Sequence, residues 1–181
     1  MKSQDSVARN SVYAEVLGNA VGLSLNYDRI VLKKEKISMS FCIGAATNPI
    51  NFLGSAFFNK PKFVNSPLIY GVPVSCNMIY GRGNQHFEVG VGLTYNQGYS
   101  MDINYLHEVV YYSREIFAVI RLGYRFQKKD GGLFWKLGFT PYFLIKDYIV
   151  KTDVPELSPS FISVPKVIPM GGIAIGYTFR N

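Results

Sequence analysis

The sequence predicts an all-β protein, an eight-stranded antiparallel up-and-down transmembrane β-barrel, on three observations. Large apolar residues alternate with small or polar ones through most of the chain, as in strands that have one apolar face. Aromatic residues make up 15% of the 181 residues and charged residues only 17%, below the roughly 25% of soluble domains. No apolar run reaches the roughly 18 residues of a membrane helix, so a membrane-spanning chain must close its strands into a barrel.

The first four strands are predicted at residues 11–18, 22–32, 36–46 and 68–81. The second and third are clear, because Leu-Ser-Leu-Asn-Tyr-Asp and Ile-Ser-Met-Ser-Phe-Cys-Ile-Gly place every large apolar side chain on one face. The first and fourth are weaker, with apolar residues alternating against Glu15 in one and against Ser75 and Asn77 in the other.

The last four strands are predicted at residues 85–96, 110–127, 132–147 and 167–180. The fifth strand alternates most regularly, from Phe87 to Asn96. The sixth and seventh set single basic residues opposite large apolar ones. In the eighth, Gly172 and Gly176 alternate with Ile173, Ile175 and Tyr177. Each pattern has the period of a strand with two different faces.

The connections predict the orientation of the barrel. Residues 33–35, 82–84 and 128–131 are short links, whereas 47–67, 97–109 and 148–166 are long, and only the short link 18–21 departs from this order. Outer-membrane barrels have short periplasmic turns and longer external loops. We therefore expect a barrel domain over residues 11–181 in the outer membrane of a Gram-negative cell, with both termini periplasmic and residues 1–10 as a periplasmic extension.

The contrast between the two faces predicts which one points outward. One face carries Leu, Ile, Val, Phe and Tyr, and the other carries Gly, Ser, Thr and Asn with isolated charges. A solvated outer surface would carry many Lys and Glu, whereas small residues suit a narrow lumen. We expect the apolar face in lipid. The alternative is a soluble, lipocalin-like carrier of an apolar ligand, which would bury Leu25, Val91 and Ile175 inside.

Charged residues in the lumen phase are the first candidate site. They are Glu15, Asp28, Glu88, Arg121, Arg125, Lys136 and Arg180. An eight-stranded barrel is only wide enough for side chains to fill it, and charges confined there must pair. The sequence therefore predicts a packed lumen ionic network, and the alternative is a narrow outer-membrane pore lined by the same charges.

Aromatic residues in the long connections are the second candidate site. These residues are Phe52, Phe57, Phe58, Phe63, Tyr99 and Tyr105. Exposed aromatic surface usually contacts something. We expect these loops to contact the lipopolysaccharide layer or a partner protein, such as a larger outer-membrane protein complex.

Both ends of the chain resemble a known family. Residues 10–29 resemble the opening hairpin, and residues 176–181 the last strand, of the small outer-membrane β-barrel proteins common in Bacteroidota. The resemblance implies an integral outer-membrane protein that the barrel-assembly machinery inserts by its C-terminal strand. Here Arg180 and Asn181 follow the last Phe, which departs from the common terminal Phe.

Several other functions are disfavoured by the sequence. A hydrolase needs a nucleophile, a base and an orienting carboxylate, but His86 lies beside a turn and His107 is followed by Glu and Val rather than by a serine two residues on. We expect no enzyme activity, no cofactor and no metal site. The net charge of +7 is scattered over turns and strands, so nucleic acid is not an expected partner. By phase, Cys42 faces the lumen and Cys76 the lipid.

Overall fold

The structure, a computed structural model, describes residues 8–20, 22–48, 68–104, 107–151 and 166–180. These residues form a single antiparallel sheet. Its strands are β1 (Asn10–Leu17), β2 (Leu23–Lys33), β3 (Ile37–Asn48), β4 (Leu68–Arg82), β5 (Gln85–Asn104), β6 (His107–Gln127), β7 (Gly132–Phe139), β8 (Tyr142–Lys151), β9 (Val167–Ile168) and β10 (Gly171–Phe179).

These ten strands occupy eight positions in the barrel wall. Against β6, Leu122 pairs with Phe139 of β7 and Val119 pairs with Tyr142 of β8, so the register continues across the break. The break falls at Pro141, which has no amide hydrogen to donate to a ladder. In the same way β9 and β10 share one wall position. The prediction of eight strands is confirmed.

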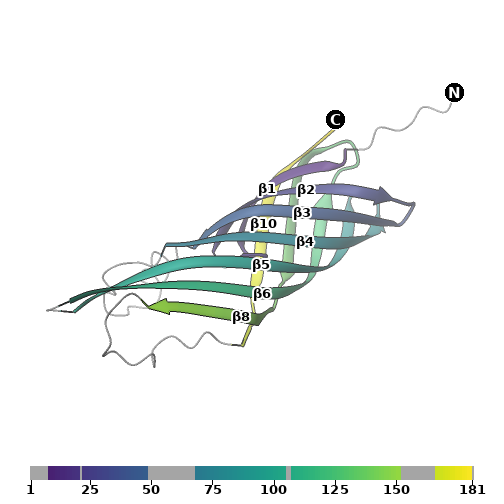
Figure 1. Ribbon diagram of the computed structural model, residues 1–181. Coiled ribbons are helices and arrows are strands. Elements are labelled where there is room, and N and C mark those ends of the chain that lie inside the picture. Colours follow the sequence, from purple (N-terminus) through teal and green to yellow (C-terminus); the bar gives the residue numbers. More distant parts are fainter. Residues whose placement is uncertain (1–7, 21, 49–67, 105–106, 152–165, 181) are drawn as a thin grey trace.

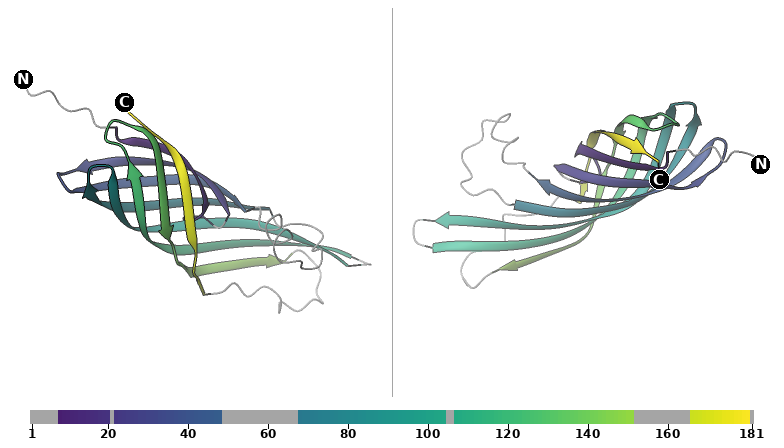
Figure 2. Two further views of the ribbon diagram at one scale, coloured as in Figure 1. Left: turned by 180° about the vertical axis from the view of Figure 1, so that it is seen from behind. Right: turned by 90° about the horizontal axis from the view of Figure 1, so that it is seen from above.

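The sheet closes on itself. The eight wall positions follow one another in chain order and each pairs with the next, including β5 with β6. The first and last positions then pair, as β1 with β10, from Asn10 opposite Phe179 to Leu17 opposite Gly172 (Figures 1 and 2). The start of β1 and the turns after β2, β4 and β6 lie at one end, where the Ala8 amide donates to the Lys129 carbonyl. Among the described residues, no helix is long and apolar enough to cross a membrane.

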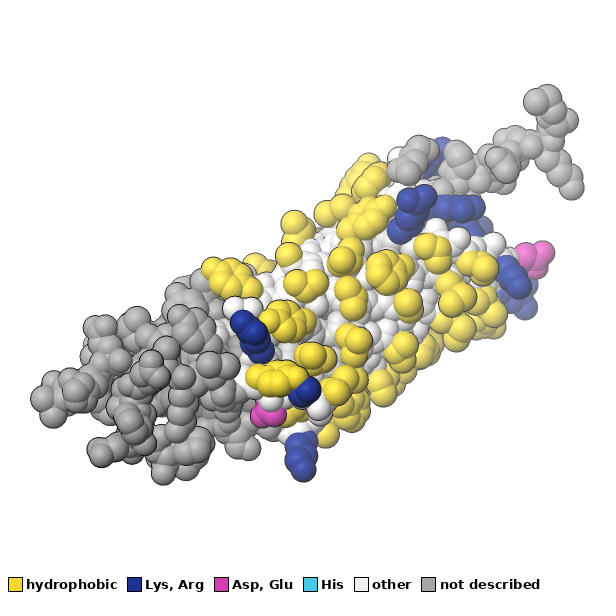
Figure 3. All heavy atoms as spheres, viewed as in Figure 1, with side chains coloured by type: hydrophobic (Ala, Val, Ile, Leu, Met, Phe, Trp, Pro, Cys, Tyr) yellow, Lys and Arg dark blue, Asp and Glu magenta, His cyan; other side chains and the backbone are white. Residues whose placement is uncertain are grey.

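The wall is apolar outside and polar inside. The outward side chains of Leu25, Val91 and Ile175 are 61%, 63% and 58% exposed, while the alternating positions Asn26 and Thr94 are buried in the lumen. Figure 3 shows hydrophobic side chains over the middle of the wall, with Lys and Arg gathered toward its ends. This distribution suits lipid around the barrel. The lipocalin-like alternative, which needs the three apolar residues inside, is therefore wrong.

The strands extend further than predicted into all three long connections, by two residues in β3 and four in β8, and the largest difference is between β5 and β6. Residues 97–109 are not a loop, because β5 runs to Asn104 and β6 begins at His107. The two strands pair continuously out to Asn104 opposite His107, so their backbone groups are satisfied within the hairpin. Figure 1 shows this hairpin extending beyond its neighbours. In the other two long connections, most of the residues, 49–67 and 152–165, lie outside the described part of the chain.

Candidate functional site

The lumen holds a cluster of buried charged side chains, hereafter the ion cluster. Because alternate residues of a strand face opposite sides, one or two positions on each of five strands meet at the barrel axis. All of these side chains are at most 2% exposed. Its members are Glu15 of β1, Asp28 of β2, Glu88 of β5, Arg121 and Arg125 of β6, and Lys136 of β7.

Glu88 is the centre of the ion cluster. Its Oε1 lies 3.0 Å from Arg121 Nε and 3.1 Å from Lys136 Nζ, and its Oε2 lies 3.2 Å from Arg125 Nη1. Both carboxylate oxygens are therefore in contact with cations. This one carboxylate therefore forms ion pairs with three bases from two other strands.

The two other acids complete the charge balance. Arg121 Nη2 lies 2.5 Å from Glu15 Oε1, and Arg125 Nη1 lies 2.5 Å from Asp28 Oδ2. Lys136 Nζ also lies 3.8 Å from Asp28 Oδ2. The cluster thus contains three acids and three bases. The pairs of Glu15 with Arg121 and of Asp28 with Arg125 cross the lumen between strands that are not neighbours in the wall, whereas Glu88 pairs with the arginines of the adjacent strand β6. Such compensation is what makes buried charge tolerable.

Two aromatic side chains pack against the cations of the cluster. The rings of Tyr13 and Phe134 meet edge to face, with centroids 5.4 Å apart. Arg125 Cζ lies 4.8 Å from the Phe134 centroid, and Lys136 Nζ lies 4.5 Å from the Tyr13 centroid. These contacts add cation–π attraction to the ion pairs. Sequence reasoning missed both rings, although they share the phase of Glu15 and Lys136, because it assigned large aromatics to the lipid face.

The turn between β1 and β2 folds into the lumen at the opposite end from the short turns. Asn19 and Ala20 are buried, and the Asn19 amide donates to Glu15 Oε2 at 3.2 Å. Thr94 Oγ1 donates to the Asn19 carbonyl at 2.6 Å, and Tyr142 OH donates to the Gly18 carbonyl at 2.7 Å. Contacts to β5 and β8 therefore hold this inward turn over the ion cluster. The signal for it was the short link 18–21, which broke the pattern of long external loops.

Glycine is required where this turn begins. Gly18 has a φ of +120°, and a Cβ on it would collide with the Glu15 side chain. Leu17 also has a positive φ, at 57°, so the chain reverses sharply into the barrel. The turn and the Glu15 carboxylate of the ion cluster are therefore in direct contact.

Arg180 is not part of the lumen network, contrary to the prediction. It follows the end of β10, where the strand alternation no longer fixes its direction. Its side chain is 46% exposed and pairs with Asp130 of the β6–β7 turn at 2.8 Å. The pair lies at the end of the barrel that carries the short turns.

The predicted contact surface is described only in part. Phe52, Phe57, Phe58, Phe63 and Tyr105 lie outside the described residues. Tyr99 belongs to β5, where its backbone pairs with Tyr112 of β6, rather than to a loop.

The cysteines and histidines lie apart from one another. Cys42 is buried with its sulfur 3.1 Å from Tyr13 OH, and Cys76 is exposed on the outer face, as their phases predicted. His86 lies near the β4–β5 turn, and His107 is at the far end of β6. Over the described ranges, no three metal-binding side chains gather in one place.

Two solved structures share the fold. The N-terminal β-barrel domain of Pseudomonas aeruginosa OprF aligns with a TM-score of 0.52 and 10% identity, covering 96% of this chain and 98% of that domain. A major outer membrane protein from Thermus thermophilus aligns with a TM-score of 0.51 and 14% identity, covering 93% of this chain and 99% of the other. No protein-family model and no curated protein sequence matches the chain, so nothing assigns it to the Bacteroidota family that its ends resemble. The chain has the fold of an outer-membrane β-barrel.

Proposed function

We propose that this chain is an integral outer-membrane protein with a closed, non-conducting lumen, acting as a non-enzymatic structural or accessory component. The observation that carries the proposal is the ion cluster, in which three acids and three bases fill the barrel axis in mutual contact. A permeating ion would have to separate pairs such as Arg125 and Asp28, which are fully buried. The turn between β1 and β2, which folds inward at Asn19, adds a second obstruction between the ion cluster and the end of the barrel opposite the short turns.

The membrane location is supported by the outer surface and by the fold. Large apolar side chains face outward around the wall, and an outward apolar band is the surface that outer-membrane barrels present to lipid. Of the two aligned structures, one is a major outer membrane protein by name and the other is a β-barrel domain by name. Insertion would then require the barrel-assembly machinery.

The external contact is part of the same proposal. β5 and β6 have 20 and 21 residues, against 15 in β4 and 10 in β8, so their hairpin extends past the strands on either side. A paired hairpin holds its own shape beyond the membrane and can present side chains to a partner protein or to lipopolysaccharide. We infer that this hairpin, together with the neighbouring loops, forms the contact surface.

Planar-bilayer recording tests the closed lumen. Purified protein that shows a mobility shift between unheated and boiled SDS gels is folded, and this form should give no stable unitary current. The variant Arg180→Ala should behave identically, because Arg180 lies outside the lumen. Reproducible current steps from the folded native protein would replace this proposal with the narrow-pore alternative.

A further inference from the structure

The end of the barrel that carries the short turns contains a strongly basic cavity. It has a volume of about 310 Å³ and is lined by the three hairpin turns that close this end. Six lining residues, hereafter the basic mouth, carry a positive charge. They are Lys33, Lys34, Lys36, Arg82, Lys128 and Lys129.

The positive charge of the basic mouth is not balanced nearby. Glu35 is the single acid among the residues that line the cavity. Asp130 of the adjoining turn is already paired with Arg180. The ion cluster deeper in the lumen contains equal numbers of acids and bases, so it has no surplus carboxylate to offer. Cations held together without counter-charges repel one another, and a bound anion would relieve that repulsion.

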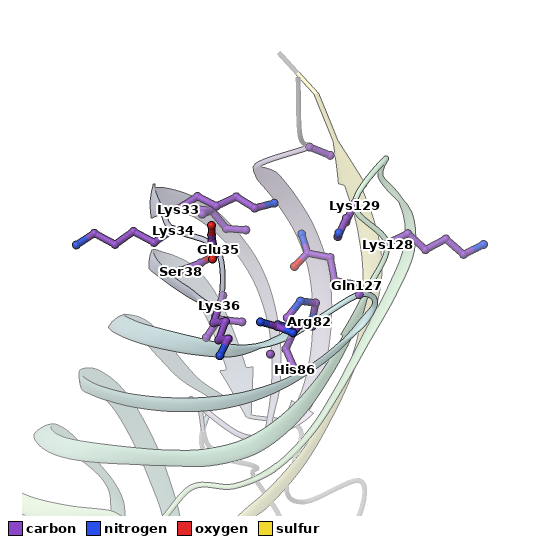
Figure 4. A pocket seen from close by; sticks show the side chains of 15 residues that line it. Lys33, Lys34, Glu35, Lys36, Ser38, Arg82, His86, Gln127, Lys128 and Lys129 are labelled. Atoms are coloured by element: carbon purple, nitrogen blue, oxygen red, sulfur yellow. The ribbon is translucent and has the colours of Figure 1, made fainter. Parts of the chain in front are cut away.

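The cavity has an inner group and an outer group of cations. Figure 4 shows the Lys33 side chain extending across the opening toward Lys129, with Arg82 lower in the cavity beside His86, and these three cations form the inner group. Lys34 and Lys128, the outer group, point away from the cavity. The inner group comes from the end of β2, the end of β4 and the β6–β7 turn, so three separate hairpins converge on one space.

The inner wall of the cavity carries two polar side chains beside the buried apolar residues Ala8, Ile30 and Ile79. Gln127 and His86 line it, and Gln127 Oε1 accepts a hydrogen bond from Arg125 Nε at 2.7 Å. The His86 Nδ1 atom is buried and has no hydrogen-bond partner within the described part of the chain. The cavity therefore combines a cationic opening with a mixed inner wall that offers two polar side chains, and the cations make an anionic group the ligand that fits it best.

We propose that the basic mouth binds a phosphate-bearing anion with at least two negative charges, held chiefly by Lys33, Arg82 and Lys129. Lys and Arg are the side chains that recognise phosphate, and Arg adds bidentate geometry. Two or more charges are needed because one exposed ion pair contributes little in water. The size and the position at the edge of the apolar wall fit either a soluble diphosphate or the headgroup of a phospholipid with two phosphates. This inference does not depend on whether the lumen conducts.

The test compares two double variants with the same change in net charge. Lys33→Gln/Lys129→Gln removes inner cations, and Lys34→Gln/Lys128→Gln removes outer ones. Each folded protein, checked by its mobility shift, is placed in phosphatidylcholine nanodiscs and titrated with inorganic pyrophosphate by calorimetry. A second arm measures, by native mass spectrometry, retention of cardiolipin from mixed nanodiscs.

The native protein should bind at least one of the two probes. The inner double variant should lose about tenfold or more in affinity, which is the effect of about 1.4 kcal/mol, and the outer double variant should lose much less. Binding of pyrophosphate supports a soluble ligand, and retention of cardiolipin alone supports a lipid headgroup. Equal losses in the two variants would indicate only general charge attraction and would overturn the site. Absence of binding of both probes at low salt would overturn it as well.

Discussion

Replacing Glu88 with Gln should strongly destabilise the barrel. The substitution keeps the size of the side chain but removes the charge that contacts Arg121, Arg125 and Lys136 within 3.2 Å. The ion cluster would then hold three bases against two acids. An amide NH₂ group would also replace one of the carboxylate oxygens and face a cation.

The magnitude follows from burial. Removing one partner of a buried ion pair costs about 3–5 kcal/mol, because a charge remains without compensation in a low-dielectric interior. Asp130→Asn is the matched control, since it removes one carboxylate from an ion pair whose aspartate is 91% exposed. Exposed pairs contribute about 0–1 kcal/mol. The two substitutions make the same chemical change in opposite environments.

Urea unfolding in phosphatidylcholine vesicles measures both variants. The fraction of protein that keeps the fast mobility on unheated SDS gels reports folding. Fluorescence of Trp135, the chain's single tryptophan, gives an independent signal, because its ring faces outward and stacks on Phe126 with centroids 6.0 Å apart. The double variant Glu88→Gln/Lys136→Met restores two acids against two bases and should recover about 0.5–3 kcal/mol. Equal unfolding midpoints for the Glu88 and Asp130 variants, or no recovery in the double variant, would refute the argument.

Two further predictions concern the packing of the wall and the directions of its faces. Gly176→Ala should lower the urea midpoint of unfolding, because a Cβ there would collide with the Val12 carbonyl and the Tyr13 side chain. Gly171→Ala should have little effect, because its Cβ would meet only one backbone oxygen, at 3.6 Å. Equal midpoints for the two variants would contradict this prediction. An apolar maleimide should modify Cys76 alone in the folded barrel and both cysteines after boiling, which mass spectrometry of peptides detects. Modification of Cys42 in the folded protein would show that the lumen is open to the reagent.

The wall of the barrel follows from the sequence because a strand has a period of two. Once Leu25 or Val91 is placed in lipid, the neighbouring positions must face the lumen, and Glu88 is fixed there by its own strand. The directions of six of the seven charged side chains could be assigned in this way without knowing which strands pair. The pairing of Arg121 with Glu15 across the lumen could not, since it depends on the tilt and stagger of the closed sheet.

The errors occur where the period no longer applies. Arg180 has the lumen phase but lies past the last ladder pair, so its side chain is free to reach Asp130. The segment 97–109 was predicted as a loop because alternation weakens there. However, a hairpin that has left the lipid does not need one apolar face, and its strands can continue on backbone pairing alone. The alternation of apolar and polar residues indicates whether each side chain faces lipid or the lumen. It indicates the backbone conformation only indirectly.

The ion cluster also explains how this sequence specifies its register. In lipid, an all-apolar strand would be almost as stable after a slip of one residue, because both faces would be equivalent. A slip of β6 by one residue would instead turn Arg121 and Arg125 out of the lumen and into the bilayer. An arginine that faces lipid costs from about 0–1 kcal/mol near the interface to about 2–4 kcal/mol at the midplane, and each would also lose its partner acid. A charged lumen therefore penalises the wrong alignment more than it stabilises the right one. On this argument the buried charges contribute specificity of folding, a role that is compatible with the closed lumen proposed above.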